Sequence, residues 1–124
     1  MRYMVLLRMD ESAGAPPAEL VGAMGEAMQQ AFASGLMIDA GGLAPTAQST
    51  EVRLRGGSVM ITDGPYAEAK EVAGGYAILE TRSHEEAVEN ARRMIAIHQQ
   101  YWPGWEGAAE VRRISGPDEG PTPG

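Results

Sequence analysis

The sequence predicts an α+β protein in which two helices cover one face of an antiparallel sheet. Three observations lead to this fold class. Short apolar segments of strand length occur along the whole chain, two longer segments have helical spacing, and a pair of glycines joins two strand patterns into a hairpin. With 124 residues, 44% of them hydrophobic, the chain is expected to form one domain with one core.

The first strand and the first helix are predicted from the N-terminal third. Residues 3–7 are an unbroken apolar run, which predicts a central strand buried on both faces, because a half-exposed strand would alternate. Residues 17–34 carry apolar side chains at helical spacing. Pro17 suits the first turn of this helix and Gly35 suits its C-terminal stop.

Two glycines interrupt this helix pattern. Gly22 and Gly25 each cost roughly 1 kcal/mol relative to alanine inside a helix, so close packing of the helix on a sheet would explain them. Residues 36–39, just after the helix, form a short apolar segment that is closed by two further glycines and predicts a strand.

A β-hairpin is predicted in the middle of the chain. Residues 50–55 alternate apolar and charged side chains, and Gly56 and Gly57 join them to the strand pattern of residues 58–62. Two glycines between two strand patterns are a strong hairpin signal. Residues 75–80 predict another strand.

The second helix begins with a capping box, in which Ser83 is the N-cap and Glu86 is the third helical residue. Its predicted apolar face runs to His98, where the helix is expected to end. A Trp-Pro-Gly-Trp turn occupies residues 102–105, and residues 109–114 predict the last strand.

This order of elements is a ferredoxin-like pattern with an inserted hairpin, in a domain over residues 1–114 that a flexible tail, 115–124, follows. Two helices can cover only one face of the sheet, whereas the first strand is predicted to be buried on both. A second copy of the chain is the simplest cover for the other face. We therefore expect a homodimer with facing sheets.

Composition excludes several classes of function. The net charge of −7 opposes nucleic acid, and no apolar run approaches the length of a membrane span. The chain has no cysteine, its N-terminal apolar run is too short for a signal peptide, and we expect a cytoplasmic protein. It has no nucleotide-binding motif, and its two histidines are fourteen positions apart, so we expect neither a cofactor nor a metal.

The segment TDGPYAEAKE, residues 62–71, is the densest polar stretch in the middle of the chain. One interpretation is a corner: Asp63 holds the turn through backbone N–H groups, Gly64 supplies an unusual φ, and Pro65 fixes the next residue. The other is a site, because a rigid turn at a strand end would hold the Asp63 carboxylate beside a phenol and several charges.

Further candidate residues lie at the end of the second helix. His98 is predicted on the buried side of that helix, where it either satisfies the helix end or serves as an acid–base residue at a pocket mouth. Trp102 and Trp105 either complete the core or an interface, or form the wall of a pocket for an aromatic molecule.

The chain resembles the YCII-related family, in the branch named for an Asp-Gly-Pro-Phe motif, with Tyr66 in place of the Phe. The residues that carry this resemblance cover about 1–114, namely Met1-Arg2-Tyr3-Met4, Gly42-Leu43-Ala44-Pro45, residues 63–71 with Gly74-Gly75-Tyr76, and Trp102-Pro103-Gly104-Trp105-Glu106-Gly107. The resemblance implies a fold of the dimeric α+β barrel type. It also implies lyase-type activity in a few members, while many occur beside genes for extracytoplasmic-function sigma factors.

The resemblance carries over only in part at the residue level. The wider family is associated with a His–Asp dyad whose histidine lies in the first helix, and this chain has no histidine between residues 17 and 34. Gly41 stands where relatives often have Glu, and Tyr101 where some have a second His. These departures remove titratable groups and weaken the case for catalysis.

Two hypotheses about function follow. The first is a cofactor-free lyase or isomerase acting on a small molecule, for which an aromatic compound is one option, with Asp63 as the base, His98 as the acid, and Tyr66, Lys70 and Trp102 as substrate contacts. The second is a non-catalytic ligand-binding or regulatory dimer linked to an extracytoplasmic-function sigma factor. They differ in whether Asp63 keeps a carboxylate oxygen free of the turn.

Overall fold

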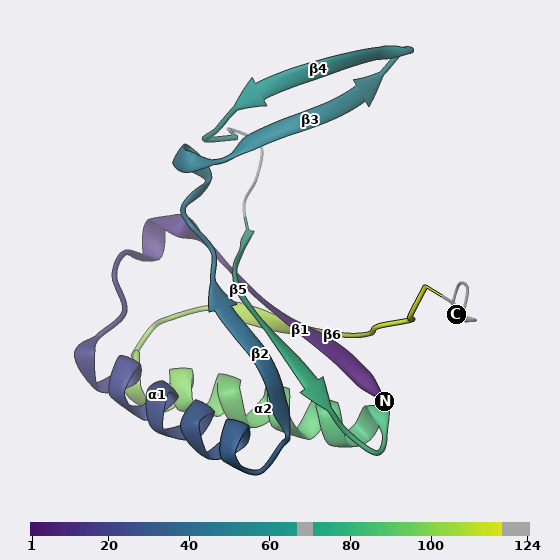
Figure 1. Ribbon diagram of the computed structural model, residues 1–124. Coiled ribbons are helices and arrows are strands. Elements are labelled where there is room, and N and C mark those ends of the chain that lie inside the picture. Colours follow the sequence, from purple (N-terminus) through teal and green to yellow (C-terminus); the bar gives the residue numbers. More distant parts are fainter. Residues whose placement is uncertain (67–70, 118–124) are drawn as a thin grey trace.

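The computed structural model describes residues 1–66 and 71–117 of the chain (Figure 1). Lys70 and the tail beyond residue 117 lie outside the described residues. The elements are, in order, β1 (Arg2–Met9), η1 (Glu11–Ala13), α1 (Ala18–Ala33), β2 (Met37–Gly42), η2 (Thr46–Gln48), β3 (Thr50–Arg55), β4 (Ser58–Asp63), β5 (Val72–Glu80), α2 (His84–Tyr101) and β6 (Gly107–Arg113).

Four strands form one antiparallel sheet in the order β2-β5-β1-β6, and both helices lie on one face of it (Figure 1). Strand β1 is central, as the unbroken apolar run predicts. Strands β3 and β4 pair only with each other and form a separate hairpin. The predicted ferredoxin-like α+β fold with an inserted hairpin is therefore confirmed.

The core lies between this sheet and the helices. Along β1, Tyr3 and Val5 point toward the helices and are 3% and 1% exposed. Val5 pairs with Ala77 of β5 and Val111 of β6, which places these side chains on the same face. Together with Leu79 they form the apolar layer that the helices cover.

The second face of the sheet is also apolar at its centre. Met4 and Leu6 alternate with the core residues of β1, and Ile78 lies opposite Met4 in β5. All three side chains are partly buried by their neighbours in the sheet. Among the described residues, no layer of the chain lies over them, and we refer to this surface as the open face (Figure 1).

The helix boundaries follow the predicted signals. Pro17 precedes α1, and Gly35 just after it has φ of 81°. The Ser83 hydroxyl accepts a hydrogen bond from the Glu86 N–H at 3.1 Å, which satisfies one of the free donors at the start of α2. Helix α2 extends to Tyr101, three residues beyond the predicted end. No helix of the described residues is long and apolar enough to cross a membrane.

The β3–β4 hairpin stands away from the sheet, on the side opposite the helices (Figure 1). Its turn is made by Gly56 and Gly57, with φ of 58° and 78°, which are conformations that glycine adopts without strain. Arg55 pairs with Ser58 across this turn, and the register continues to the pair of Thr50 and Asp63. We call this hairpin the arm.

The expectation that close packing explains Gly22 and Gly25 is wrong. A Cβ atom built at either position meets no atom within 4 Å, because both residues lie on the exposed side of α1. Their conformational cost is therefore not offset by a contact with the sheet within the chain.

We expect Gly22→Ala and Gly25→Ala each to stabilise the fold by roughly 1 kcal/mol, because alanine lowers the entropy lost by the backbone and fits the open space. Urea denaturation measures the effect. Gly35→Ala is the matched control, and should destabilise the protein because φ there is 81°. Unchanged or lower stability for both helix variants would show that another molecule packs on this side of α1.

Candidate functional site

Asp63 ends strand β4 at the base of the arm. Its Oδ1 accepts a hydrogen bond at 3.0 Å from the hydroxyl of Thr50, the residue that faces it across the hairpin. Within residues 1–66 and 71–117, its Oδ2 accepts no hydrogen bond. In that part of the chain the carboxylate bonds a side chain and no backbone N–H group, so the corner interpretation stays a prediction and Oδ2 is free there.

Gly64 is required for a different reason than the expected one. Its φ does not lie in the left-handed region that favours glycine. Its N–H donates to the Ser49 carbonyl oxygen at 2.9 Å, and a Cβ atom at this position would overlap the carbonyl oxygen of Thr46. The close approach of two backbone segments, and not an unusual φ, excludes a side chain here. The following peptide bond, to Pro65, is cis.

Tyr66 is tied to the segment that leads into the arm. Its hydroxyl lies 2.9 Å from Oγ of Ser49, which itself lies 2.7 Å from the Thr46 carbonyl oxygen. Because one serine hydroxyl carries one proton, a bond from Ser49 to the Thr46 carbonyl leaves the Tyr66 hydroxyl to donate to Ser49. The phenol therefore holds the two sides of the arm base together.

Glu11 fixes the same base to the end of β1. Its carboxylate accepts hydrogen bonds from the Thr46 hydroxyl and, at 2.8 Å, from the Thr46 N–H. The bond from the hydroxyl, followed by that from the N–H, lowers the pKa of Glu11 below its ordinary value. The arm is thus anchored at its base by side chains from several parts of the sequence.

His98 and the tryptophans form a separate cluster at the end of α2. His98 is 4% exposed, and its Nδ1 lies 2.8 Å from the Met94 carbonyl oxygen one turn earlier. Its ring centroid is 4.6 Å from that of Trp105, which stacks on Trp102 at 6.1 Å. The indole N–H of Trp105 is buried and has no partner among the described residues. With Nδ1 used by the backbone, only Nε2 of His98 could exchange a proton with a ligand.

The sequence-predicted site residues therefore fall into two groups. Asp63 and Tyr66 lie at the base of the arm, whereas His98 and Trp102 lie at the end of α2, across the sheet (Figure 1). Among the described residues, no hydrogen bond or ion pair joins the Asp63 carboxylate to the His98 imidazole, and Lys70 lies outside the described part of the chain.

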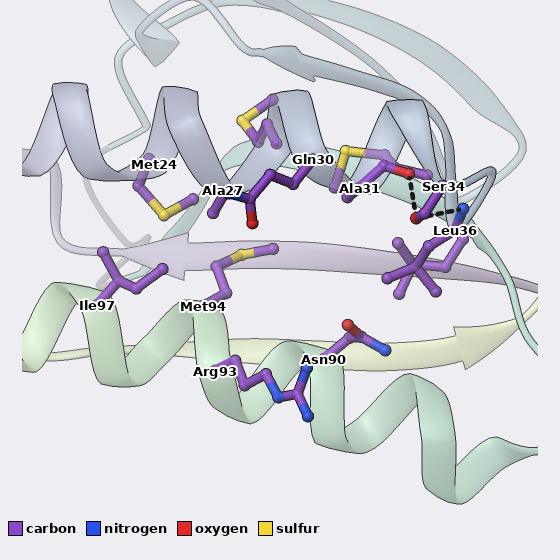
Figure 2. A pocket seen from close by; sticks show the side chains of 13 residues that line it. Met24, Ala27, Gln30, Ala31, Ser34, Leu36, Asn90, Arg93, Met94 and Ile97 are labelled. Carbon is purple, nitrogen blue, oxygen red and sulfur yellow. Dashed lines mark hydrogen bonds between the residues drawn. The ribbon is translucent and has the colours of Figure 1, made fainter.

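The structure shows a cleft that the sequence did not reveal. It lies between α1 and α2, has a volume of about 400 Å³, and is apolar along most of its length (Figure 2). Met24 and Ala27 face it from α1, and Met94 and Ile97 face them from α2. Its other lining residues are Met28, Gln30, Ala31, Ser34, Leu36, Met37, Leu79, Asn90 and Arg93.

The polar lining of this cleft comes from both helices. Ser34 and Asn90 lie toward the end with Leu36, whereas the Gln30 amide lies beside Ala27, and Arg93 contributes from α2 (Figure 2). Ser34 is internally bonded, because its hydroxyl donates to the Ala31 carbonyl at 3.1 Å and accepts from the Leu36 N–H at 3.4 Å. Asn90 also uses its amide, which donates through Nδ2 to the Glu86 carbonyl oxygen at 2.9 Å. Gln30 and Arg93 are therefore the groups best placed to meet a polar ligand atom.

Two further cavities adjoin the cleft. One, of about 230 Å³, shares Met24, Met28, Met37 and Met94 with it and extends along the sheet to Gly41 and Gly75. The other, of about 420 Å³, is polar and shares Ser34, Leu36, Asn90 and Arg93. Arg93 thus lies where an apolar interior meets a polar entrance.

Arg93 forms an ion pair with a residue of its own helix. Its Nε lies 3.4 Å from Oε1 of Glu89, which also binds Arg92 at 2.7 Å. The hydrogen bond from Arg92, aided by the charges of both arginines, lowers the pKa of Glu89 to about 2. Because Glu89 has its shorter bond with Arg92, the longer and more exposed contact with Arg93 is the one that a ligand anion could replace most easily.

The comparisons with known proteins agree with the fold. A small ferredoxin-like α+β domain with an apolar cleft between its helices is the class of protein that the structure defines. A family model, the YCII-related domain, matches residues 1–114, and the chain belongs to this family. No curated protein matches the chain.

The close approach of Gly64 to the Thr46 carbonyl oxygen can be tested by substitution. We expect Gly64→Ala to displace the Thr46 carbonyl and break the contact between Ser49 and Tyr66, because the added methyl group overlaps backbone. Amide NMR shifts of residues 46–50 report the change. Gly42→Ala, where a Cβ meets nothing within 4 Å, should leave them unchanged. Equal spectra for both variants would contradict the proposed packing of the corner.

Proposed function

We propose that the chain forms a homodimer that binds a small amphipathic molecule in the cleft between α1 and α2. The observation that carries this proposal is the cleft of about 400 Å³, which is lined mostly by apolar side chains with a few polar ones among them. This volume lies within the range of small-molecule sites, which are mostly apolar with a few convergent polar groups.

The lining indicates the class of ligand. An aliphatic or aromatic body would lie against Met24, Met28 and Met94, whose unbranched side chains adapt to different shapes. A carboxylate or another hydrogen-bond acceptor would lie toward the guanidinium of Arg93. A weak organic acid with an apolar body fits both requirements.

The same lining favours binding over catalysis in this cleft. Arg93 is the one titratable residue among those that line it. A guanidinium stays protonated in proteins and cannot act as a general base. General acid–base chemistry would need a group with a pKa near the working pH, and the cleft offers none from its own lining.

The lyase or isomerase hypothesis is a second candidate, which the free Oδ2 of Asp63 favours. In this proposal Asp63 is the base and Tyr66, Lys70 and Trp102 contact the substrate. His98 lies across the sheet from the arm, so its role as the acid would require a residue from another copy or a different proton donor. The site would then form only in an assembly.

The homodimer is proposed to form through the open face of the sheet. Met4, Leu6 and Ile78 place apolar side chains at its centre, with Glu110 and Arg112 on β6 beside them. Burying this centre against the same surface of a second copy would remove apolar area from water on both sides. The proposed location is the cytoplasm, which the lack of cysteines supports.

A regulatory role is one form of this proposal. In that form, a ligand in the cleft would alter the packing of α1 on α2, and a partner such as an extracytoplasmic-function sigma factor would respond to the altered surface. Membership of the Asp-Gly-Pro-Phe branch stays a prediction, which Asp63, Gly64 and Pro65 support.

A thermal-shift screen of apolar carboxylic acids, aromatic and aliphatic, tests the cleft. A ligand present at a hundred times its Kd should stabilise the protein by about 2.7 kcal/mol, and raise Tm accordingly. We expect Ala27→Phe, which fills the cleft, and Arg93→Gln, which removes its cation, to reduce the shift. Arg92→Gln is the matched control, since this arginine does not line the cleft.

Asp63→Asn separates the two candidate functions in the same screen. Loss of the shift in Asp63→Asn, with Ala27→Phe and Arg93→Gln unaffected, would place the ligand at the arm and overturn the cleft proposal. A flat screen for the wild type would also count against it.

The dimer has its own test. Sedimentation at micromolar concentration should give twice the 13.2 kDa mass of one chain. Leu6→Glu, in the centre of the open face, should shift the equilibrium at least tenfold toward monomer, because a buried unpaired carboxylate is costly. Val21→Glu on the exposed side of α1 should have no effect. A monomeric wild type, or a Leu6→Glu variant that remains dimeric, would contradict the open-face interface.

A further inference from the structure

The arm carries an exposed apolar stripe. Val52 pairs with Ile61 and Leu54 pairs with Val59, so the four side chains share one face of the hairpin. They are 67%, 72%, 73% and 68% exposed, respectively. We call Val52, Leu54, Val59 and Ile61 the stripe.

The stripe needs a cover. The four exposed side chains of the stripe together present roughly 400 Å² of apolar surface. This area is close to that of the largest apolar patch on a typical monomer. A lone two-stranded hairpin is also marginal in water and normally requires another layer. The exposed fractions of the four side chains show that the described residues leave most of the stripe uncovered.

The other face of the arm is suited to solvent. It carries Glu51, Arg53 and Arg55, and Arg53 bonds Glu51 through its Nε at 2.9 Å. Met60 is the one large apolar side chain on this face. The arm is therefore amphipathic, and a covering layer would lie on one side only.

The base of the arm is fixed in a position away from the helices. The contacts of Thr46 with Glu11 and of Tyr66 with Ser49 hold it there. The arm that carries the stripe consequently stands on the side of the sheet opposite the helices, as the open face does (Figure 1). One occupant on that side could cover both apolar surfaces.

We propose that the occupant is a second copy of this chain, so that each protomer lays its arm on the other. This inference rests on the proposed homodimer and deepens it. The open face alone offers few apolar side chains, all partly buried already, whereas a stable interface takes about 800 Å² from each partner. Adding the stripe brings the apolar contribution toward that size, and two-fold symmetry lets each copy give and receive one arm.

The proposal also places Asp63. Thr50 and Asp63 are the pair next to Val52 and Ile61 in the hairpin register, and alternate residues of a strand share a face. The Asp63 carboxylate therefore lies at the end of the stripe, with Oδ2 at the edge of the surface that the partner covers. A polar or catalytic role of Asp63 would act on the partner copy or at the boundary between the copies.

The absence of cysteine from the chain makes the test direct. Val59→Cys places a thiol in the stripe, and Met60→Cys places one on the opposite face of the same strand, at a position that is 47% exposed. At concentrations where the protein is dimeric, a thiol reagent should modify Val59→Cys at least tenfold more slowly than Met60→Cys. Dilution to monomer should make the two rates equal.

The outcomes separate this inference from the dimer itself. If sedimentation shows a dimer and Val59→Cys reacts as fast as Met60→Cys, the arm inference is wrong while the dimer stands, and another molecule would be the occupant. Slow modification of Val59→Cys in the diluted monomer would mean that the chain covers its own stripe, which also overturns it. If no dimer forms at any concentration, the proposed homodimer has failed first.

Discussion

The structure depends on the two apolar faces of strand β1. Val5 is buried against the helices, and Leu6, its neighbour, points to the opposite side of the sheet. Two helices cover one face of a four-stranded sheet, so the apolar residues of the second face are left without a layer from residues 1–66 and 71–117. The assembly proposed for this protein follows from that imbalance, because the hydrophobic effect acts on both faces alike.

The elements of the fold could be predicted because each depends on local chemistry. The capping box at Ser83 and the glycine pair at Gly56 and Gly57 set boundaries through neighbouring atoms alone. The cleft could not be predicted from the sequence, because the methionines of α1 and α2 have a helical spacing that would also suit a closed core. Only the distance between the two helices decides whether these side chains fill the space or line a cavity.

In the candidate site, too, some features follow from the local sequence and others depend on distant parts of the chain. The place of Asp63 at a strand end was accessible from the sequence, but its hydrogen bond to Thr50 and the free Oδ2 depend on hairpin register. The reason for Gly64 was also hidden. A side chain at Gly64 would overlap the backbone of Thr46, which lies eighteen positions earlier in the sequence. A contact between segments so far apart leaves no local sequence pattern. His98 was correctly placed on the buried side of α2, but its separation from Asp63 is a property of the topology.

The cleft and the base of the arm therefore differ in the chemistry that their side chains can support. The cleft is apolar and offers a single cation, so it can select a ligand by shape and charge but cannot move a proton through its own lining. The base of the arm holds a carboxylate whose Oδ2 accepts no hydrogen bond from the described residues. The proposed binding uses the cleft of one chain, whereas the proposed chemistry uses the carboxylate of Asp63. If both occur, the assembly of two chains links them, because the arm that carries Asp63 extends from the same sheet on which the cleft is built.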